Sequence, residues 1–275
     1  PAIAVAIATA MSAPSLVVYA ATVVGIAGNE LGGPMGVYIA TIIAVEFGKL
    51  VSKKTKIDII ITPAVTVLVG VFIANFVGPY ISAFMNLLGA IIINATDKAP
   101  FFMGIIVSVI VGIVLTLPIS SAALCMMLSL SSLAGGAATI GCCCQMVGFA
   151  VISYRDNKME GLVAQGLGTS MLQMPNIVRK PIIIIPPIIS SAILGPVSTM
   201  IFKLENTPLG SGMGTSGLVG QISTFTAMPD VPFTKLLGII LLMHIILPGL
   251  VTFAIYEVLY RKGLIQDGDM KLYFK

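Results

Sequence analysis

The chain has 275 residues, of which 57% are hydrophobic and 9% are charged, and its formal net charge is +4. Soluble domains contain about 25% charged residues, so this composition excludes an ordinary soluble globular protein. We therefore expect an all-α, polytopic integral membrane protein. The basic residues occur in short scattered clusters, which is typical of membrane topology signals and not of a nucleic-acid-binding surface.

The first two apolar stretches lead into a basic loop. Residues 1–27 form one stretch that we expect to break near Pro14, and residues 33–50 form the second. Four lysines follow within eight residues, at positions 49, 53, 54 and 56, and such a cluster favours the cytoplasmic side. Because the chain begins with Pro1 and is apolar from its start, we expect further residues upstream, either more helices or a signal peptide.

The next apolar stretches are residues 57–77 and 80–95, which are followed by a short polar loop. Gly78-Pro79 separates them, and a proline after a glycine is expected to end a helix. The sequence therefore predicts two membrane crossings here.

Two more crossings are expected within residues 101–117 and 119–153, which are punctuated by Pro118 and Gly135-Gly136. They end at a second basic loop with Arg155 and Lys158. An even number of crossings must separate two loops on one side, and four crossings between residues 57 and 153 satisfy this condition. Both basic loops are thus predicted to be cytoplasmic.

Residues 160–175 differ from the long apolar stretches because they are short and amphipathic. One helical face carries the apolar residues Val163, Leu167, Met171 and Met174, while the amides Gln165 and Gln173 lie elsewhere on the helix. We expect an amphipathic helix at the cytoplasmic interface. The alternative is a short, poorly formed linker, because the segment contains three glycines.

The last two spans are residues 181–202 and 233–260. The first has 22 residues, about 33 Å if helical, which is long enough to cross despite three prolines. Arg261 and Lys262 follow the second span and place the C-terminus in the cytoplasm. Residues 203–232 must then begin and end on the outer side, and the total is about eight transmembrane helices.

Residues 205–221, "ENTPLGSGMGTSGLVGQ", contain five glycines. Such a stretch cannot form a spanning helix, and we expect a re-entrant hairpin whose backbone approaches a ligand. The alternative is that Gly210 and Gly214 form a packing face of small residues. The candidate substrate-binding residues are Glu205, Asn206, Thr207, Gly210, Gly212, Gly214, Thr215, Ser216, Gln221 and His244.

Three ionisable side chains lie within or beside apolar stretches. The alternative to a functional role is an ion pair with Lys49 for Glu46, and one with Lys203 for Glu205. His244, the only histidine, would contact a ligand or Glu205, or would bond a backbone carbonyl.

No self-contained catalytic site, metal site or cofactor is predicted. Cys125 stands alone, and the run of cysteines at positions 142–144 cannot face one metal ion because successive helix residues point about 100° apart. We interpret these cysteines as small apolar helix residues. The carboxylate, amide, hydroxyl and backbone groups of residues 205–221 suit a ligand with many hydroxyls, such as a sugar.

Four segments resemble one family of membrane proteins: "KTKIDIIITP" at 54–63, residues 176–202, "NTPLGSGMGTSGLVGQ" at 206–221 and "YRKGLIQDGDMKL" at 260–272. The whole chain, as one domain over residues 1–275, is similar to enzyme IIC, the sugar permease of the bacterial phosphotransferase system. The resemblance includes the perfringolysin regulator-like proteins of Gram-positive bacteria.

This resemblance implies a homodimer in the bacterial plasma membrane, with re-entrant hairpins and a cytoplasmic amphipathic helix. It implies a sugar permease whose separate partners, enzymes IIA and IIB, supply the phosphate, so that the chain is at most the membrane subunit of a sugar phosphotransferase. Transporting members usually pair a hairpin glutamate with an earlier histidine, whereas His244 follows the hairpin. The alternatives are a ligand-sensing membrane regulator and an uncoupled facilitator.

Overall fold

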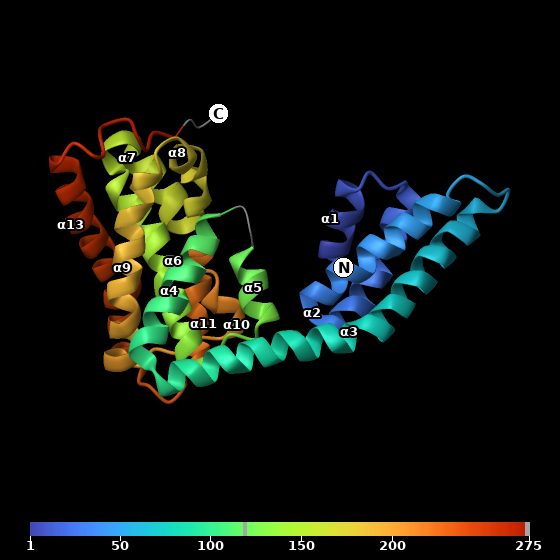
Figure 1. Cartoon of the computed structure of the whole chain (residues 1–275), viewed down its shortest axis with the longest axis horizontal. Coiled ribbons are helices and arrows are strands. Elements are labelled where there is room, and N and C mark those ends of the chain that lie inside the picture. Colours follow the sequence, from blue (N-terminus) through green and yellow to red (C-terminus); the bar gives the residue numbers. More distant parts are fainter. Residues whose placement is uncertain (118–119, 273–275) are drawn as a thin grey trace. The chain divides into compact units, whose positions relative to one another are not determined.

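The computed structural model describes residues 1–117 and 120–272, and within these residues every regular element is helical (Figure 1). Five helical runs are long and apolar enough to cross a membrane: Ser15–Val51, Asp58–Lys98, Ser132–Ile152, Pro181–Phe202 and Phe233–Arg261. The prediction of an all-α, multi-pass membrane protein is confirmed at this level. The chain divides into two compact units, Pro1–Leu88 and Gly89–Lys275.

The first unit begins with α1 (Ala2–Ala10) and α2 (Ser15–Val51), so the expected break near Pro14 is confirmed. Gly33 interrupts α2 with φ 59° and ψ −160°, in a region that favours glycine. The chain folds back at Gly33, and residues on the two sides of the kink come close: a Cβ on Gly28 would lie 2.8 Å from the Cα of Val37. The two arms of α2 therefore pack against each other, which matches the two apolar stretches expected before the basic loop.

α3 (Asp58–Lys98) is one continuous helix of 41 residues, so the predicted break at Gly78-Pro79 is wrong. The helix has about twice the roughly 20 residues that one crossing of a bilayer needs. Gly78 is instead a contact residue, because a Cβ on Gly32 would lie 3.0 Å from the Cα of Gly78. A proline inside a helix costs backbone hydrogen bonding but does not always end the helix.

The second unit is built around α6 (Ser132–Ile152), which is buried along almost its whole length. It packs against α4 (Pro100–Thr116), α9 (Ile185–Pro196) and α13 (Leu247–Arg261). Glycine contacts bring these helices close, since a Cβ on Gly141 would overlap the carbonyl oxygen of Ser108.

α5 (Ser121–Met127) precedes α6. Gly135 and Gly136 were expected to interrupt a helix, but both lie inside the continuous helix α6. They instead allow residues 204–206 to approach α6 closely. Pro118, the other expected break, lies outside the described residues.

Short helical pieces replace the expected amphipathic helix. They are α7 (Tyr154–Val163), the π-helix η1 (Ala164–Gly168), η2 (Ser170–Gln173), α8 (Met174–Arg179) and η3 (Pro181–Ile184). The prediction of one amphipathic helix over residues 160–175 is thus wrong. The basic stretch "YRDNK", which was expected to be a loop, is the first part of α7. The expected faces nevertheless separate: Leu167 and Met171 are exposed, whereas Gln165 and Gln173 are fully buried in the protein.

The last two predicted spans are helical throughout. α9 continues into the π-helix η4 (Val197–Phe202), and α12 (Phe233–Ile240) continues through the π-helix η6 (Leu241–Ile246) into α13. Between them lie only α10 (Pro208–Ser211), η5 (Ser216–Leu218) and α11 (Val219–Ala227). The expectation that the glycine-rich stretch does not form a long helix is therefore confirmed. Figure 1 shows α7, α8 and the C-terminal segment together at one end of the second unit.

Candidate functional site

Asn206 anchors the start of the glycine-rich segment, residues 205–221, which we call the hairpin. Its Nδ2 lies 2.7 Å from Thr139 Oγ1 of α6, 3.0 Å from the Gly220 carbonyl oxygen and 3.2 Å from Thr224 Oγ1 of α11. Its Oδ1 accepts a hydrogen bond from the Thr207 N–H at 2.8 Å. The buried amide is thus fully engaged within the protein, and it ties both ends of the hairpin to α6.

Thr207 and Ser211 shape the first turn of the hairpin. Thr207 Oγ1 accepts from the Gly210 N–H at 3.4 Å and caps α10, which begins with Pro208. Ser211 Oγ donates to the carbonyl oxygen of Leu130 at 2.9 Å, just before α6. Thr207 therefore has a local structural role in addition to any contact with a ligand.

Four of the five hairpin glycines are sites of close packing. A Cβ on Gly212 would overlap the carbonyl oxygen of Ser121, whose hydroxyl donates to the Gly212 carbonyl at 2.6 Å. Gly214 has φ +54°, and a Cβ there would lie 2.7 Å from the Cβ of Cys142. A Cβ on Gly210 would overlap the side chain of Ser223, and a Cβ on Gly220 would overlap the carbonyl oxygen of Gly214. This geometry supports the packing interpretation of the glycines and extends it beyond two positions.

The middle of the hairpin touches the segment that follows α7. Thr215 Oγ1 donates to the carbonyl oxygen of Gly166 in η1 at 2.5 Å and lies 3.6 Å from Met146 Sδ of α6. Ser216 is half-buried beside it. A pocket of about 270 Å³ adjoins this contact and is lined almost entirely by apolar side chains of α6, α7, η1 and η6, together with Thr215 and Leu218.

His244 is paired with Gln221, a partner that was not predicted. Gln221 Nε2 lies 3.1 Å from His244 Nδ1, and both side chains are buried. Cys143 Sγ is 3.8 Å from the same amide nitrogen. Gln221 Oε1 is buried and has no hydrogen-bond partner among the described residues. Each residue was a sequence candidate, but 23 positions and a helix separate them, so only the fold brings them together.

Glu205 is half-buried, and its carboxylate makes no hydrogen bond or ion pair within the described part of the chain. The surface pair with Lys203 is thus not formed, whereas the pair between Glu46 and Lys49 is formed at 2.9 Å. The Glu205 N–H points to Met228 Sδ at 3.4 Å. Among the described residues, the Glu205 carboxylate therefore has no partner.

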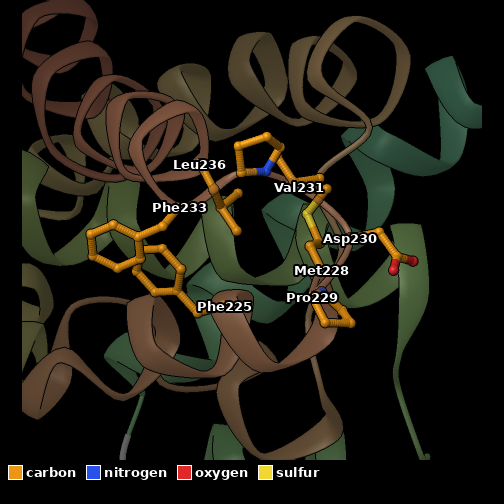
Figure 2. A pocket seen from close by; sticks show the side chains of 8 residues that line it. Phe225, Met228, Pro229, Asp230, Val231, Phe233 and Leu236 are labelled. Atoms are coloured by element: carbon orange, nitrogen blue, oxygen red, sulfur yellow. The ribbon is translucent and has the colours of Figure 1, made fainter.

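Met228, which the Glu205 N–H contacts, lines a pocket of about 410 Å³ whose other lining residues come from positions 225–236. Figure 2 shows the rings of Phe225 and Phe233 on one side of Met228 and the Asp230 carboxylate on the other. The two rings are stacked with centroids 5.0 Å apart. Sequence reasoning missed this loop, residues 228–232, because a single aspartate between two prolines is an ordinary turn signal.

The ten candidate residues thus fall into separate groups. Asn206, Thr207 and Gly210 belong to the anchored turn, and Gln221 pairs with His244. No hydrogen bond or ion pair among the described residues joins Glu205 to His244. The cysteines at positions 142–144 lie buried in α6 as free thiols, consistent with the predicted packing role.

Comparison with known proteins identifies a family for the chain. A family model described as "Phosphotransferase system, EIIC" matches residues 1–272, which include the hairpin and the C-terminal segment. Neither the curated proteins nor the solved structures gave a significant match.

Proposed function

We propose that this chain, which belongs to the EIIC family of the phosphotransferase system, is a membrane permease subunit for a sugar or a similar polar small molecule. In this proposal the hairpin is re-entrant and about eight segments cross the bacterial plasma membrane, with the C-terminus in the cytoplasm. In this proposal the interruption at Gly33 divides the run Ser15–Val51 into two crossings, and the shorter apolar helix α4 adds one more to the five long runs.

The unpaired carboxylate of Glu205 carries the proposal. A half-buried charge in an apolar protein is unfavourable unless a polar group meets it, and such groups are usually functional in membrane proteins. Sugar hydroxyls are good donors to a carboxylate. The pocket beside Met228 adds a second carboxylate, Asp230, and the aromatic side chains of Phe225 and Phe233, of which Phe233 is exposed.

Phosphate transfer would depend on separate partners. EIIC family membership implies soluble EIIA and EIIB proteins, which would deliver phosphate to the bound sugar on the cytoplasmic side. We further propose a two-fold homodimer that uses small and apolar residues of the early helices, because a chain of this length must build both a scaffold and a cavity.

A ligand-sensing regulator without transport is the second candidate. The observation that favours it is the pairing of His244 with Gln221, which leaves no free histidine beside Glu205. A site without that second group would bind a ligand but would lack the usual pair of polar groups for transport.

Uptake by reconstituted protein distinguishes the two candidates. The purified chain would first be screened against sugars and polyols by calorimetry, and proteoliposomes would then be loaded with the ligand that binds. We expect counterflow of the labelled ligand into the loaded vesicles, and none into protein-free vesicles. Binding without counterflow would favour the regulator.

A further inference from the structure

The chain after α13 turns back across the ends of α7 and α8. Two of its side chains, Ile265 and Met270, are completely buried in an apolar cluster with Ile177, Ile183 and Tyr256. Extended terminal segments are usually poorly ordered unless they are tied down. The C-terminal segment of this chain is therefore a packed part of the second unit.

Asp156 and Asn157, both in α7, hold the main chain of this segment. The Asp156 carboxylate accepts hydrogen bonds from the N–H groups of Gly268 at 2.8 Å and Met270 at 3.1 Å. Asn157 accepts from the Leu272 N–H at 2.7 Å and donates to the Met270 carbonyl oxygen at 2.8 Å. Two adjacent side chains thus satisfy four backbone groups.

Side chains of the following helices complete the clasp. Gln173 donates to the Met270 carbonyl oxygen at 3.0 Å, and Asn176 donates to the Lys271 carbonyl oxygen at 3.0 Å. Lys180 forms an ion pair with Asp269 at 2.5 Å. Asn157, Gln173 and Asn176 are buried, so the loss of their backbone partners would leave unsatisfied polar groups.

The clasping segment, residues 154–180, faces the hairpin with its other side. Gly166 accepts the hydrogen bond from Thr215 of the hairpin. Ser170 Oγ lies 2.8 Å from Thr116 Oγ1 of α4, which in turn donates to Gln145 of α6 at 3.2 Å. One short segment therefore connects the C-terminal residues to the middle of the candidate ligand site.

We propose that residues 265–272 are a latch that holds the clasping segment against the hairpin. Release of the latch removes the partners of Asp156, Asn157 and Gln173, and the clasping segment then loosens its hold on Thr215. The coupling is reciprocal, so a change at Thr215 alters the protection of the latch.

Hydrogen exchange measured by mass spectrometry on the full chain in lipid nanodiscs tests the latch. Asp156→Ala removes two charge-assisted hydrogen bonds, and we expect exchange to rise by about tenfold in residues 262–272. We expect a rise also in residues 160–173 and no change in residues 132–152. The control is Glu160→Ala, because Glu160 is an exposed carboxylate on the same helix that makes no hydrogen bond or ion pair among the described residues, and its loss should leave both segments unchanged.

Faster exchange confined to residues 262–272 would overturn the proposal and make the segment a passive end. Thr215→Val gives an independent reading, since it leaves the clasp intact and is expected to raise exchange in residues 262–272. Asp269→Asn, which removes the ion pair with Lys180 and keeps an oxygen that can accept from the Gln266 N–H, replaces Asp156→Ala if that variant fails to fold. Unchanged latch protection in Thr215→Val would also overturn the coupling.

Discussion

The amide of Asn206 and the hydroxyl of Thr139 form a buried hydrogen bond of 2.7 Å that fastens the hairpin to the central helix α6. Asn206 sits immediately after Glu205, so the bond also holds the backbone next to that carboxylate. The two neighbours differ: the Asn206 amide is hydrogen-bonded within the protein, whereas the Glu205 carboxylate has no partner among the described residues.

Asn206→Leu should lower the free energy of unfolding by about 2–3 kcal/mol, because several buried polar groups lose their partner. Thermal unfolding in detergent, followed by circular dichroism, measures the change. Thr226→Val is the matched control, since its exposed hydroxyl bonds only the Ile222 carbonyl within the same helix. Equal stability of the two variants would contradict the anchoring role.

Glu205→Gln should weaken ligand binding by about 1.5–3 kcal/mol, the scale of a hydrogen bond to a charged group. Calorimetry with the sugar or polyol found by screening gives the affinity. Lys203→Gln should bind like the parent, because Lys203 does not pair with Glu205. If Glu205→Gln also binds like the parent and is folded, the carboxylate is an interfacial charge and the hairpin glycines serve packing alone.

Gly136→Ala should destabilise the protein by about 3 kcal/mol, because the added methyl group would overlap the Leu204 carbonyl oxygen and the backbone must shift. Gly238→Ala makes the same chemical change in α12, where nothing lies within 4 Å of the new Cβ. That variant should gain up to about 1 kcal/mol from helix propensity. A comparison of their unfolding temperatures checks both signs, and a stable Gly136→Ala would refute the close approach.

Gln221→Leu and His244→Leu should not act independently. Each single change leaves a buried polar group unpaired, whereas the double change removes both, so a coupling energy of about 1 kcal/mol is expected. Unfolding free energies of the four proteins in the cycle give this value. Additive effects would mean that the 3.1 Å contact contributes nothing.

Lys54→Cys and Met159→Cys should be blocked by the same membrane-impermeant thiol reagent from the cytoplasmic side. Lys54 lies in the basic loop, and Met159 is exposed on α7 and is not part of the Arg155–Glu257 ion pair. The four native cysteines are buried and would be replaced first. Labelling of the two positions from opposite sides would refute the predicted orientation.

The elements that were predicted correctly have signals that are local in the sequence. The spans around residues 181–202 and 233–260 are long and apolar, and the glycines of the hairpin exclude a long helix. The predicted break at Gly78-Pro79 is wrong, because the helix continues through both residues. Gly78 instead contacts Gly32, and no local pattern in the sequence reveals this contact. The amphipathic faces of residues 160–175 were visible, but the division into short pieces depends on burial of Gln165 and Gln173 among neighbours.

The sequence indicated which residues belong to the candidate site, but it did not indicate which of them contact one another. Gln221 and His244 were both singled out, yet their pairing depends on how α11 and η6 cross. Asn206 was also singled out, but its hydrogen bonds to Thr139, Gly220 and Thr224 were not predicted. The pocket beside Met228 escaped notice, since its residues are ordinary apolar and turn residues whose proximity to Glu205 is tertiary.

The π-helices η1, η4 and η6 all border the hairpin: η1 accepts its hydroxyl bond, η4 leads into it and η6 presents His244 to it. A π-helical turn accommodates an extra residue relative to an α-helix. When such a turn reverts to α-helical bonding, the side chains beyond it rotate by about 100° while the helix stays intact. The hairpin is therefore bordered by three helical segments with π-type bonding, of which η4 and η6 lie within long apolar runs and η1 lies in the segment after α7.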